Sequence, residues 1–351
     1  MRMQRLLYKD KALIGLDIST SDIKVMAINN KKDVIGYGAI DISNEKFHKS
    51  LEENDDYLLL QLKKLFLEKI HGHLPSPQVA VSIPTSQTYS RTFSVPTSTK
   101  KDLREAIELE ISQYIPIPVT SLYVDYEIIN ESEESINVLV SAAPRLLIDK
   151  IVDACSRVNL TVNLVEPGIN SIARLLRDIE EGDLPTVIVD ISSTATDVAI
   201  LEKGIIRVTG STAVGGNTFT LDISKKLNIP LEKSHQLKVI HGLNPGSRQE
   251  SITQALNPSL KKISLEIRRV MRYYEERIKG IKVEQLIIVG GGSNIPGIGE
   301  FFTNNLVIPA RVASPWQSLN FGKLPQPAKQ LKPRYITVAG IASLTKEEIF
   351  K

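Results

Sequence analysis

Residues 187–201 read VIVDISSTATDVAIL, and residues 13–28 read LIGLDISTSDIKVMAI. Both stretches place an apolar run before an Asp-Ile-Ser turn that is rich in hydroxyl side chains, and a second apolar run after it. Short apolar runs joined by a tight polar turn are typical of a β-hairpin. One hairpin that is present twice, far apart in one chain, predicts that the protein consists of two related halves.

Composition restricts the possible classes of protein. A chain of 351 residues corresponds to about two or three domains, and 42% hydrophobic with 24% charged residues is typical of a globular protein. The 43 Lys and Arg residues nearly balance 40 Asp and Glu, so the net charge of +3 gives no reason to expect nucleic-acid binding. Cys155 is the only cysteine, which excludes disulfides within the chain and favours the cytoplasm. No apolar stretch approaches the roughly 20 residues that cross a bilayer, so we expect no membrane span.

The pattern of apolar residues predicts the elements of each half. In the first half we expect three strands, a helix over residues 48–72 that ends at Gly72, and a buried strand over 78–84. Residues 88–143 predict a β-α-β-β insertion, whose helix carries on one face Leu103, Ile107, Ile111 and Tyr114. In the second half we expect strands over 184–216, helices over 217–280, strands over 284–289 and 304–313, and a final helix over 334–350. Two α/β halves with one plan would hold a ligand in the cleft between them.

The two hairpin turns offer backbone N–H groups and hydroxyls to an anion such as a phosphate. Asp17 and Asp190 end the first strand of each hairpin, where their carboxylates could hold the hydration shell of Mg²⁺. Taken singly, each is also a common turn-capping residue, and only their repetition favours a site. Lys24 follows seven residues after Asp17, on the return strand, where its ammonium could reach a phosphate.

A glycine-rich turn follows the strand expected over 284–289. Gly290, Gly291 and Gly292 remove side chains so that the backbone can approach a flat ligand, and Ser293 or Asn294 can cap the next helix. Such a turn is a weak signal alone, because tight packing explains it equally well. The sequence contains neither the P-loop nor the dinucleotide fingerprint, so the common nucleotide-binding folds are not expected.

The order of these motifs resembles the phosphate 1, phosphate 2 and adenosine motifs of the actin and sugar kinase superfamily, whose members bind Mg-ATP between duplicated domains. VEPGINSIARLL (165–176) and YITVAGIASL (335–344) resemble its two connecting helices. REAIELEISQYIPIPVTSLYVDYEII (104–129) and VSAAPRLLIDKIVDACSRVNL (140–160) are similar to the PilM family of type IV pilus assembly, which is related to FtsA. The resemblance runs from Leu13 onward and implies an α/β, duplicated actin-like (ribonuclease H-like) ATPase fold with an inserted small α+β subdomain.

The resemblance also implies a division of the chain and a set of ligands. We expect subdomain 1A over residues 1–85 and 141–184, inserted subdomain 1C over 86–140, subdomain 2A over 185–217 and 284–330, helical subdomain 2B over 218–283, and a C-terminal connecting helix over 331–351. ATP and Mg²⁺ are the implied cofactors, with Asp17 and Asp190 holding Mg²⁺ through water. The implied nucleotide-binding residues are Asp17, Ser19, Thr20, Ser21, Lys24, Asp190, Ser192, Ser193, Thr194, Gly215, Gly216, Asn217, His235, Lys238, Gly290, Gly291, Gly292 and Ser293.

Three positions depart from the family pattern. Glycine is usual where Ser19 and Ser192 stand, and a Cβ there could crowd the nucleotide or force φ into an unfavourable region. His235 replaces a glutamate that bonds the ribose hydroxyls, whereas Lys238 is retained. Glu166 occupies the place of a carboxylate that helps to position water for catalysis in relatives, although a helix-capping role is favoured. We therefore expect ATP binding with weak or absent hydrolysis.

The PilM resemblance also implies a partner. PilM is understood to bind the short cytoplasmic N-terminus of the membrane protein PilN along its inserted subdomain. This places a partner peptide near Gln113, Tyr114 and Ile115, for which core packing is an equal alternative. FtsA proteins usually end in an amphipathic membrane helix, which residues 345–351 do not resemble, so we expect a cytoplasmic protein held at the inner face of the membrane through its partner. The alternatives are an FtsA-like cell-division or filament-forming protein, which would self-associate, and a sugar-kinase-type phosphotransferase.

Overall fold

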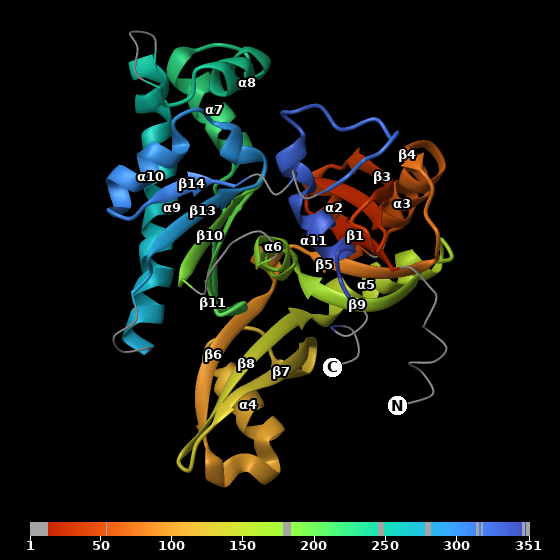
Figure 1. Cartoon of the computed structure of the whole chain (residues 1–351), viewed down its shortest axis with the longest axis vertical. Coiled ribbons are helices and arrows are strands. Elements are labelled where there is room, and N and C mark those ends of the chain that lie inside the picture. Colours follow the sequence, from red (N-terminus) through yellow and green to blue (C-terminus); the bar gives the residue numbers. More distant parts are fainter. Residues whose placement is uncertain are drawn as a thin grey trace.

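Two β-sheets organise the chain, and the computed structural model describes residues 13–53, 55–177, 184–244, 249–277, 282–313, 316, 319–345 and 348. The first sheet has six strands in the order β4-β3-β2-β1-β5-β9, and the second has eight in the order β14-β13-β10-β11-β12-β6-β8-β7. Figure 1 shows one sheet in each half of the molecule, with α6 between them.

The core of each sheet repeats one plan. In the first sheet, an antiparallel meander of three strands is followed by two strands parallel to its first strand, which gives β3-β2-β1-β5-β9. In the second sheet, β12-β11-β10-β13-β14 has the same order and the same strand directions. This repetition confirms the predicted duplicated α/β fold. The bounds are β1 (Ile14–Ile18), β2 (Asp22–Ile28), β3 (Val34–Asp41), β4 (Ile70–Gly72), β5 (Gln78–Ile83), β9 (Thr161–Pro167), β10 (Thr186–Ile191), β11 (Thr196–Glu202), β12 (Ile205–Thr212), β13 (Gln285–Val289) and β14 (Ala310–Val312).

Helices cover the outer face of each sheet and fill the space between the sheets. The stretches expected to be connecting helices form α6 and α11, where Ile172 and Val338 share one hydrophobic core with strands of both sheets. The two helices cross closely, because a Cβ on Gly340 would lie 2.0 Å from the carbonyl oxygen of Ser171. The bounds are α2 (Asn44–Glu53), α3 (Tyr57–Glu68), α5 (Arg145–Ser156), α6 (Gly168–Arg177), α7 (Gly216–Leu227), α8 (Leu231–Ile240), α9 (Gln249–Arg277), α10 (Ile298–Leu306) and α11 (Ile336–Ala342).

The inserted segment extends the sheet of the other half. It contains β6 (Tyr89–Pro96), α4 (Leu103–Ser112), β7 (Leu122–Glu131) and β8 (Ser135–Pro144) around a core of its own, in the predicted β-α-β-β order. β6 follows β5 of the first half in the chain, yet it pairs with β12 of the second half through Val208 and Arg91. The insertion therefore continues the second sheet, toward the bottom of the view in Figure 1. Short 3-10 turns complete the chain: η1 (Thr85–Gln87), η2 (Thr97–Asp102), η3 (Val119–Ser121), η4 (Gly291–Asn294) and η6 (Lys332–Tyr335).

Several predicted elements differ from the structure. The single helix over 48–72 is two helices followed by β4, and Gly72 does not end a helix. It has φ +81° in the strand, and a Cβ there would lie 2.3 Å from the carbonyl oxygen of Ile35. The strand over 304–313 begins only at Ala310, because α10 continues to Leu306. Tyr114 lies beyond the end of α4, and α11 ends at Ala342. In the part of the chain that the structure describes, no helix is long and apolar enough to cross a membrane.

Candidate functional site

A cavity of about 750 Å³ lies between the two halves. Its walls include both hairpin turns, the first turn of α7, one face of α8, the glycine turn after β13, and Arg334. All the residues predicted to bind nucleotide line it except Gly215 and Ser293. The structure therefore brings together residues that are far apart in the sequence.

The two hairpin turns close in the same way. Ser19 donates its N–H to the carbonyl oxygen of Asp22 at 2.9 Å, and its hydroxyl lies 3.0 Å from the same oxygen and 2.6 Å from Oδ1 of Asp22. Ser192 donates both groups to the carbonyl oxygen of Ala195, each at 2.9 Å. Neither serine has positive φ, so the strain expected where relatives have glycine does not arise. Instead, each serine hydroxyl locks its turn.

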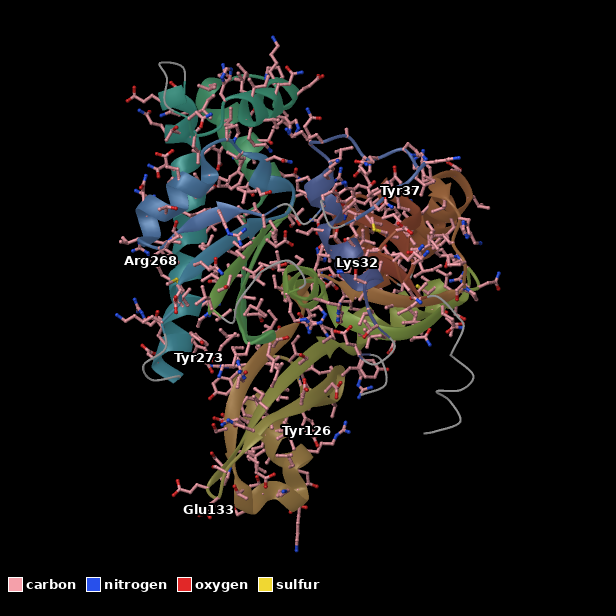
Figure 2. All side chains as sticks on the ribbon, viewed as in Figure 1. Lys32, Tyr37, Tyr126, Glu133, Arg268 and Tyr273 are labelled. Carbon is pink, nitrogen blue, oxygen red and sulfur yellow. The ribbon has the colours of Figure 1, made fainter. Side chains whose placement is uncertain are left out.

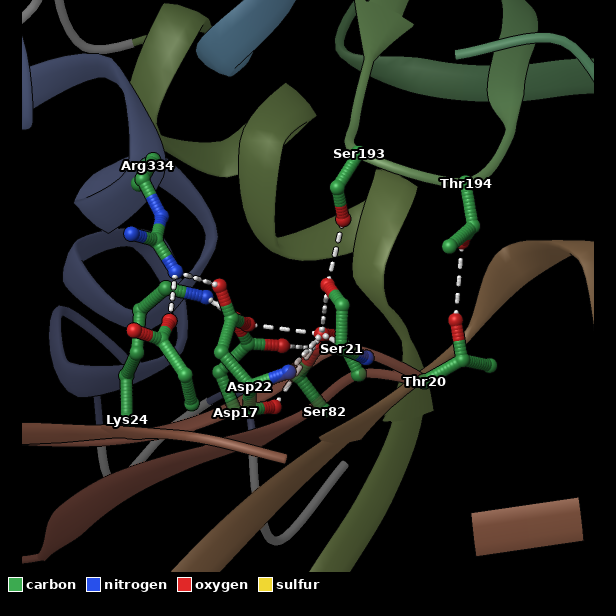
Figure 3. Close-up of polar contacts among 11 residues, drawn as sticks. Asp17, Thr20, Ser21, Asp22, Lys24, Ser82, Ser193, Thr194 and Arg334 are labelled. Atoms are coloured by element: carbon green, nitrogen blue, oxygen red, sulfur yellow. Dashed lines mark hydrogen bonds and ion pairs between the residues drawn. The ribbon is translucent and has the colours of Figure 1, made fainter. Parts of the chain in front are cut away.

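The turns also contact each other across the cavity (Figure 3). The hydroxyls of Thr20 and Thr194 lie 2.8 Å apart, and Ser21 bonds Ser193 through their hydroxyls. These two pairs form what we call the hydroxyl clasp. A phosphate placed between the turns would have to exchange these hydrogen bonds for its own.

The floor of the first hairpin is an ion network that is buried at Asp17, Asp22 and Lys24 and reaches the surface at Asp41. Lys24 pairs with Asp17 at 3.1 Å and also with Asp22, and Arg334 pairs with Asp22 at 2.8 Å and with Asp41 (Figure 3). Burial raises the pKa of Asp17, and Lys24 offsets this only in part. Burial also acts against the Asp22 carboxylate, but Lys24 and Arg334 lower the pKa of Asp22 to about 2. Lys24, predicted to reach a phosphate, is thus already paired.

The second hairpin carries an acid where the first carries the lysine. Asp190 lies opposite Asp197 in the strand register, as Asp17 lies opposite Lys24. Burial, together with the nearby Asp197, raises the pKa of Asp190 to about 8, and burial raises the pKa of Asp197 to about 6. The sequence reading missed Asp197, although it follows Asp190 by the same seven residues that separate Lys24 from Asp17.

The glycine turn packs against this second hairpin. Gly290 has φ +81°, and a Cβ there would lie 2.1 Å from Oδ1 of Asp190. A Cβ on Gly292 would meet the side chain of Ile191 at 2.2 Å, whereas one on Gly291 would have its nearest neighbour at 3.4 Å. Two of the three glycines are therefore required by packing, and Gly291 leaves space toward the cavity. Ser293 is buried and donates its hydroxyl to the carbonyl oxygen of Gly290 at 2.7 Å.

The first turn of α7 and one face of α8 form the opposite wall. Gly216 and Asn217 donate their N–H groups to the carbonyl oxygens of Ser192 and Ser193, at 2.9 and 2.8 Å, which docks α7 onto the second turn. Lys238 donates to the carbonyl oxygen of Gly216 at 2.7 Å and to Thr220 Oγ1 at 2.8 Å, and burial lowers the pKa of Lys238 to about 8.

Two further predicted residues of this region can also be placed. His235 lines the cavity on α8, where burial and the charge of Lys238 lower its pKa. Gly215 lies behind the wall, since a Cβ there would be 2.7 Å from the carbonyl oxygen of Ser192.

Glu166 lies outside the cavity, so its position does not support the predicted catalytic role. Its carboxylate accepts two N–H groups of Arg174, from Nη1 at 2.7 Å and from Nη2 at 2.8 Å, and the hydroxyl of Ser171 at 2.6 Å. All three residues are at least partly buried. These bonds join the end of β9 to α6, which is a structural role.

The residues predicted to bind a partner follow the end of α4. Ile115 is buried in the core of the inserted segment, and Gln113 bonds Glu110 at 3.2 Å. Tyr114 is 43% exposed, and the guanidinium of Arg91 lies 4.0 Å from the centroid of its ring. Tyr114 and Ile115 line a second cavity of about 410 Å³, between the inserted segment and the second half.

Comparisons with known proteins assign the family. FtsA of Neisseria meningitidis serogroup B is 28% identical over 198 residues, which are 51% of this chain and 46% of that protein. The chain spans about half the length of the curated relatives it matches first. A solved PilM-PilN type IV pilus biogenesis complex has a TM-score of 0.79 at 20% identity, covering 95% of this chain and 98% of that one. MreB 5 of Spiroplasma citri bound to AMPPNP has a TM-score of 0.51 at 16% identity, covering 94% and 95%. Residues 15–345 match the family described as type IV pilus assembly protein PilM, and the chain belongs to that family.

Proposed function

We propose that this protein binds an adenine nucleotide in the cavity between its halves and uses it as a ligand in pilus assembly. The observation that carries the proposal is the pair of similarly closed turns, which face each other across the cavity. The glycine turn and α8 supply a wall for the nucleoside, with His235 and Lys238 beside it. MreB 5 of Spiroplasma citri, which has a similar fold, was solved with AMPPNP, and this supports an adenine nucleotide here.

Mg²⁺ fits the acidic end of this cavity. Burial raises the pKa values of Asp17 and Asp190, and a divalent cation beside them would favour their charged forms. Within the described ranges, no three acidic, His or Cys side chains are placed to ligate a metal directly. We therefore propose that Asp17 and Asp190 hold Mg²⁺ through water, with Asp197 beside them.

Hydrolysis is proposed to be weak or absent. Glu166, the residue expected to position water, is engaged by Arg174 and Ser171 outside the cavity. The nucleotide would then act by its presence and not by its turnover.

The proposed partner is the short cytoplasmic tail of a PilN-like inner-membrane protein, which would hold this chain at the inner face of the membrane. The solved PilM-PilN complex supports a partner of this kind. We place the tail near Gln113, Tyr114 and Ile115, where the second cavity opens beside an exposed tyrosine.

Calorimetry tests the nucleotide part of the proposal. Mg-ATP should release or absorb binding heat with the unmutated protein and with Glu105→Ala, an exposed control on α4, but not with Asp190→Ala. ATP in excess EDTA should bind at least about tenfold more weakly, since a pair of opposite charges in a protein interior is worth more than 1.4 kcal/mol. A protein that gives no heat with Mg-ATP would refute the nucleotide proposal.

Fluorescence anisotropy tests the partner. The probe is a labelled peptide copied from the cytoplasmic N-terminus of a PilN-like inner-membrane protein. Tyr114→Ala should weaken its binding, whereas Tyr126→Ala, an exposed tyrosine on β7, should not (Figure 2). Equal affinity of both variants would contradict the placement, and nucleotide-dependent sedimentation as polymer would favour the filament-forming alternative.

A further inference from the structure

The two cavities share a wall. Thr85 and Ser86 line both the cavity between the halves and the second cavity beside the inserted segment. They belong to η1, which connects β5 of the first half to β6 of the insertion. A displacement of this short turn would therefore change the shape of both cavities.

Asp197 connects the first cavity to a wall of the second. Its side chain lines the first cavity, and its Oδ1 accepts the hydroxyl of Ser211 at 2.7 Å. Ser211 lines the second cavity and not the first. Thr85 lines both cavities, and its hydroxyl accepts the N–H of Ile169 at 3.0 Å. One buried carboxylate on β11 thus bonds a residue of β12 that belongs to the other cavity.

The junction between β12 and β6, which we call the seam, has a short strand ladder. A single pair of strand residues, Val208 and Arg91, joins β12 to β6. The guanidinium of Arg91 lies 4.0 Å from the ring centroid of Tyr114 and 4.3 Å from that of Tyr273, and its Nε donates to the Tyr273 hydroxyl at 2.6 Å. A short ladder with stacked side chains can shift more readily than a full strand pair, because few hydrogen bonds have to move.

We propose that Asp197 is a positioning residue that couples the two cavities, so that a nucleotide in the first changes the shape and the affinity of the second. The inference rests on the proposed nucleotide site and adds the regulation of the partner site to it. A nucleotide beside Asp190 and Asp197 reorients the Asp197 carboxylate, and the bond to Ser211 carries that change to β12, in the wall of the second cavity. Coupling of this kind is reciprocal, so a ligand of the second cavity changes the affinity for nucleotide by the same factor.

Hydrogen exchange measured by mass spectrometry tests the coupling with Mg-ATP as the probe. In the unmutated protein, Mg-ATP should change exchange in residues 187–195, at the nucleotide, and also in residues 205–212 and 86–93, at the seam. The expected change at the seam is at least about fivefold in rate, the lower end of typical coupling between sites. Ser211→Ala removes one link without altering the lining of the first cavity. Ser90→Ala is the matched control, because this serine also lines the second cavity but bonds Ser141.

The outcomes separate the coupling from the nucleotide proposal. The coupling is supported if Ser211→Ala loses the exchange response in residues 205–212 but keeps its calorimetric Mg-ATP affinity and its response in 187–195. The control Ser90→Ala must keep both exchange responses. A response confined to 187–195 in the unmutated protein overturns the coupling and leaves nucleotide binding intact. An unchanged seam response in Ser211→Ala overturns the role of this link. Absence of any Mg-ATP response or heat overturns the proposed function, and the coupling with it.

Discussion

Replacing Glu166 by glutamine distinguishes a structural role from a catalytic one. In the structure the carboxylate forms a two-point ion pair with Arg174, at 2.7 and 2.8 Å, and accepts the hydroxyl of Ser171. The side chains of Arg174 and Glu166 are 12% and 10% exposed, so the pair is largely removed from water. Glutamine keeps the shape but presents an amide N–H₂ group to the guanidinium, which leaves part of the Arg174 charge uncompensated.

The expected cost of Glu166→Gln is about 3 kcal/mol of unfolding free energy. Removing one partner of a buried ion pair costs roughly 3–5 kcal/mol, and the lower end applies because Arg174 keeps a second contact with Glu348, at 3.5 Å. With an unfolding entropy of about 2.1 cal/mol/K per residue over a chain of this length, the loss corresponds to a decrease in Tm of about 4 °C.

Urea denaturation and single-turnover hydrolysis of Mg-ATP together test this expectation. Glu166→Gln should lower the urea midpoint and leave any residual hydrolysis unchanged per folded molecule. Arg174→Met should also destabilise the protein. The double variant should be less destabilised than the sum of the two single variants, because it leaves neither buried charge unpaired. A Glu166→Gln protein of unaltered stability with abolished hydrolysis would refute the structural assignment and restore the catalytic one.

Three further outcomes are expected. Gly290→Ala should weaken Mg-ATP binding at least about tenfold, because its Cβ would collide with Asp190 at 2.1 Å and strain a backbone of positive φ, whereas the exposed control Glu105→Ala should not; calorimetry compares them. The pKa of Lys238 is about 8 in the folded protein and 10.5 in the unfolded chain, so between these pH values only the unfolded lysine keeps its proton. The unfolding free energy should therefore rise with pH in this range, relative to that of Lys238→Met. Urea titrations at several pH values measure the difference. Cys155 is buried in α5, and burial raises the pKa of its thiol to about 12. A thiol reagent should therefore label it in urea but not in buffer. Rapid labelling of the native protein would contradict the packing of α5.

The sequence contained enough information for the duplicated sheets and for most of the cavity lining. Each hairpin is indicated by two short apolar runs that flank a polar turn, and two similar hairpins predict two similar sheets. Asp197 is also predictable from the sequence, because it occupies in the second repeat the position that Lys24 occupies in the first. Similarity between the repeats does not point to it, because the first repeat has a lysine at this position.

Other features depend on contacts that periodicity does not encode. Arg334 reaches Asp22 and Asp41 across 312 and 293 positions of the chain, and no local pattern indicates such a pair. The pairing of β6 with β12 is similar, because the apolar pattern of a strand shows which face is buried but not which strand it will join. The apolar pattern does not reveal the break between α2 and α3, because apolar residues continue at helical spacing on both sides of residue 54.

Charge at the deep end of the cavity argues that the protein recognises a nucleotide only together with a cation. Lys24 is neutralised by Asp17 and Asp22, and Arg334 is shared by Asp22 and Asp41, so neither cation is left over for a phosphate. A polyphosphate alone would add negative charge to a buried acidic site, which is strongly unfavourable. The hydroxyl clasp offers little compensation, because phosphates would exchange hydrogen bonds there and would not add new ones. Lys238 lies on the opposite wall, so at this deep end the favourable electrostatic energy must arrive with the ligand, and for this reason chelation of Mg²⁺ is a strict test of the site.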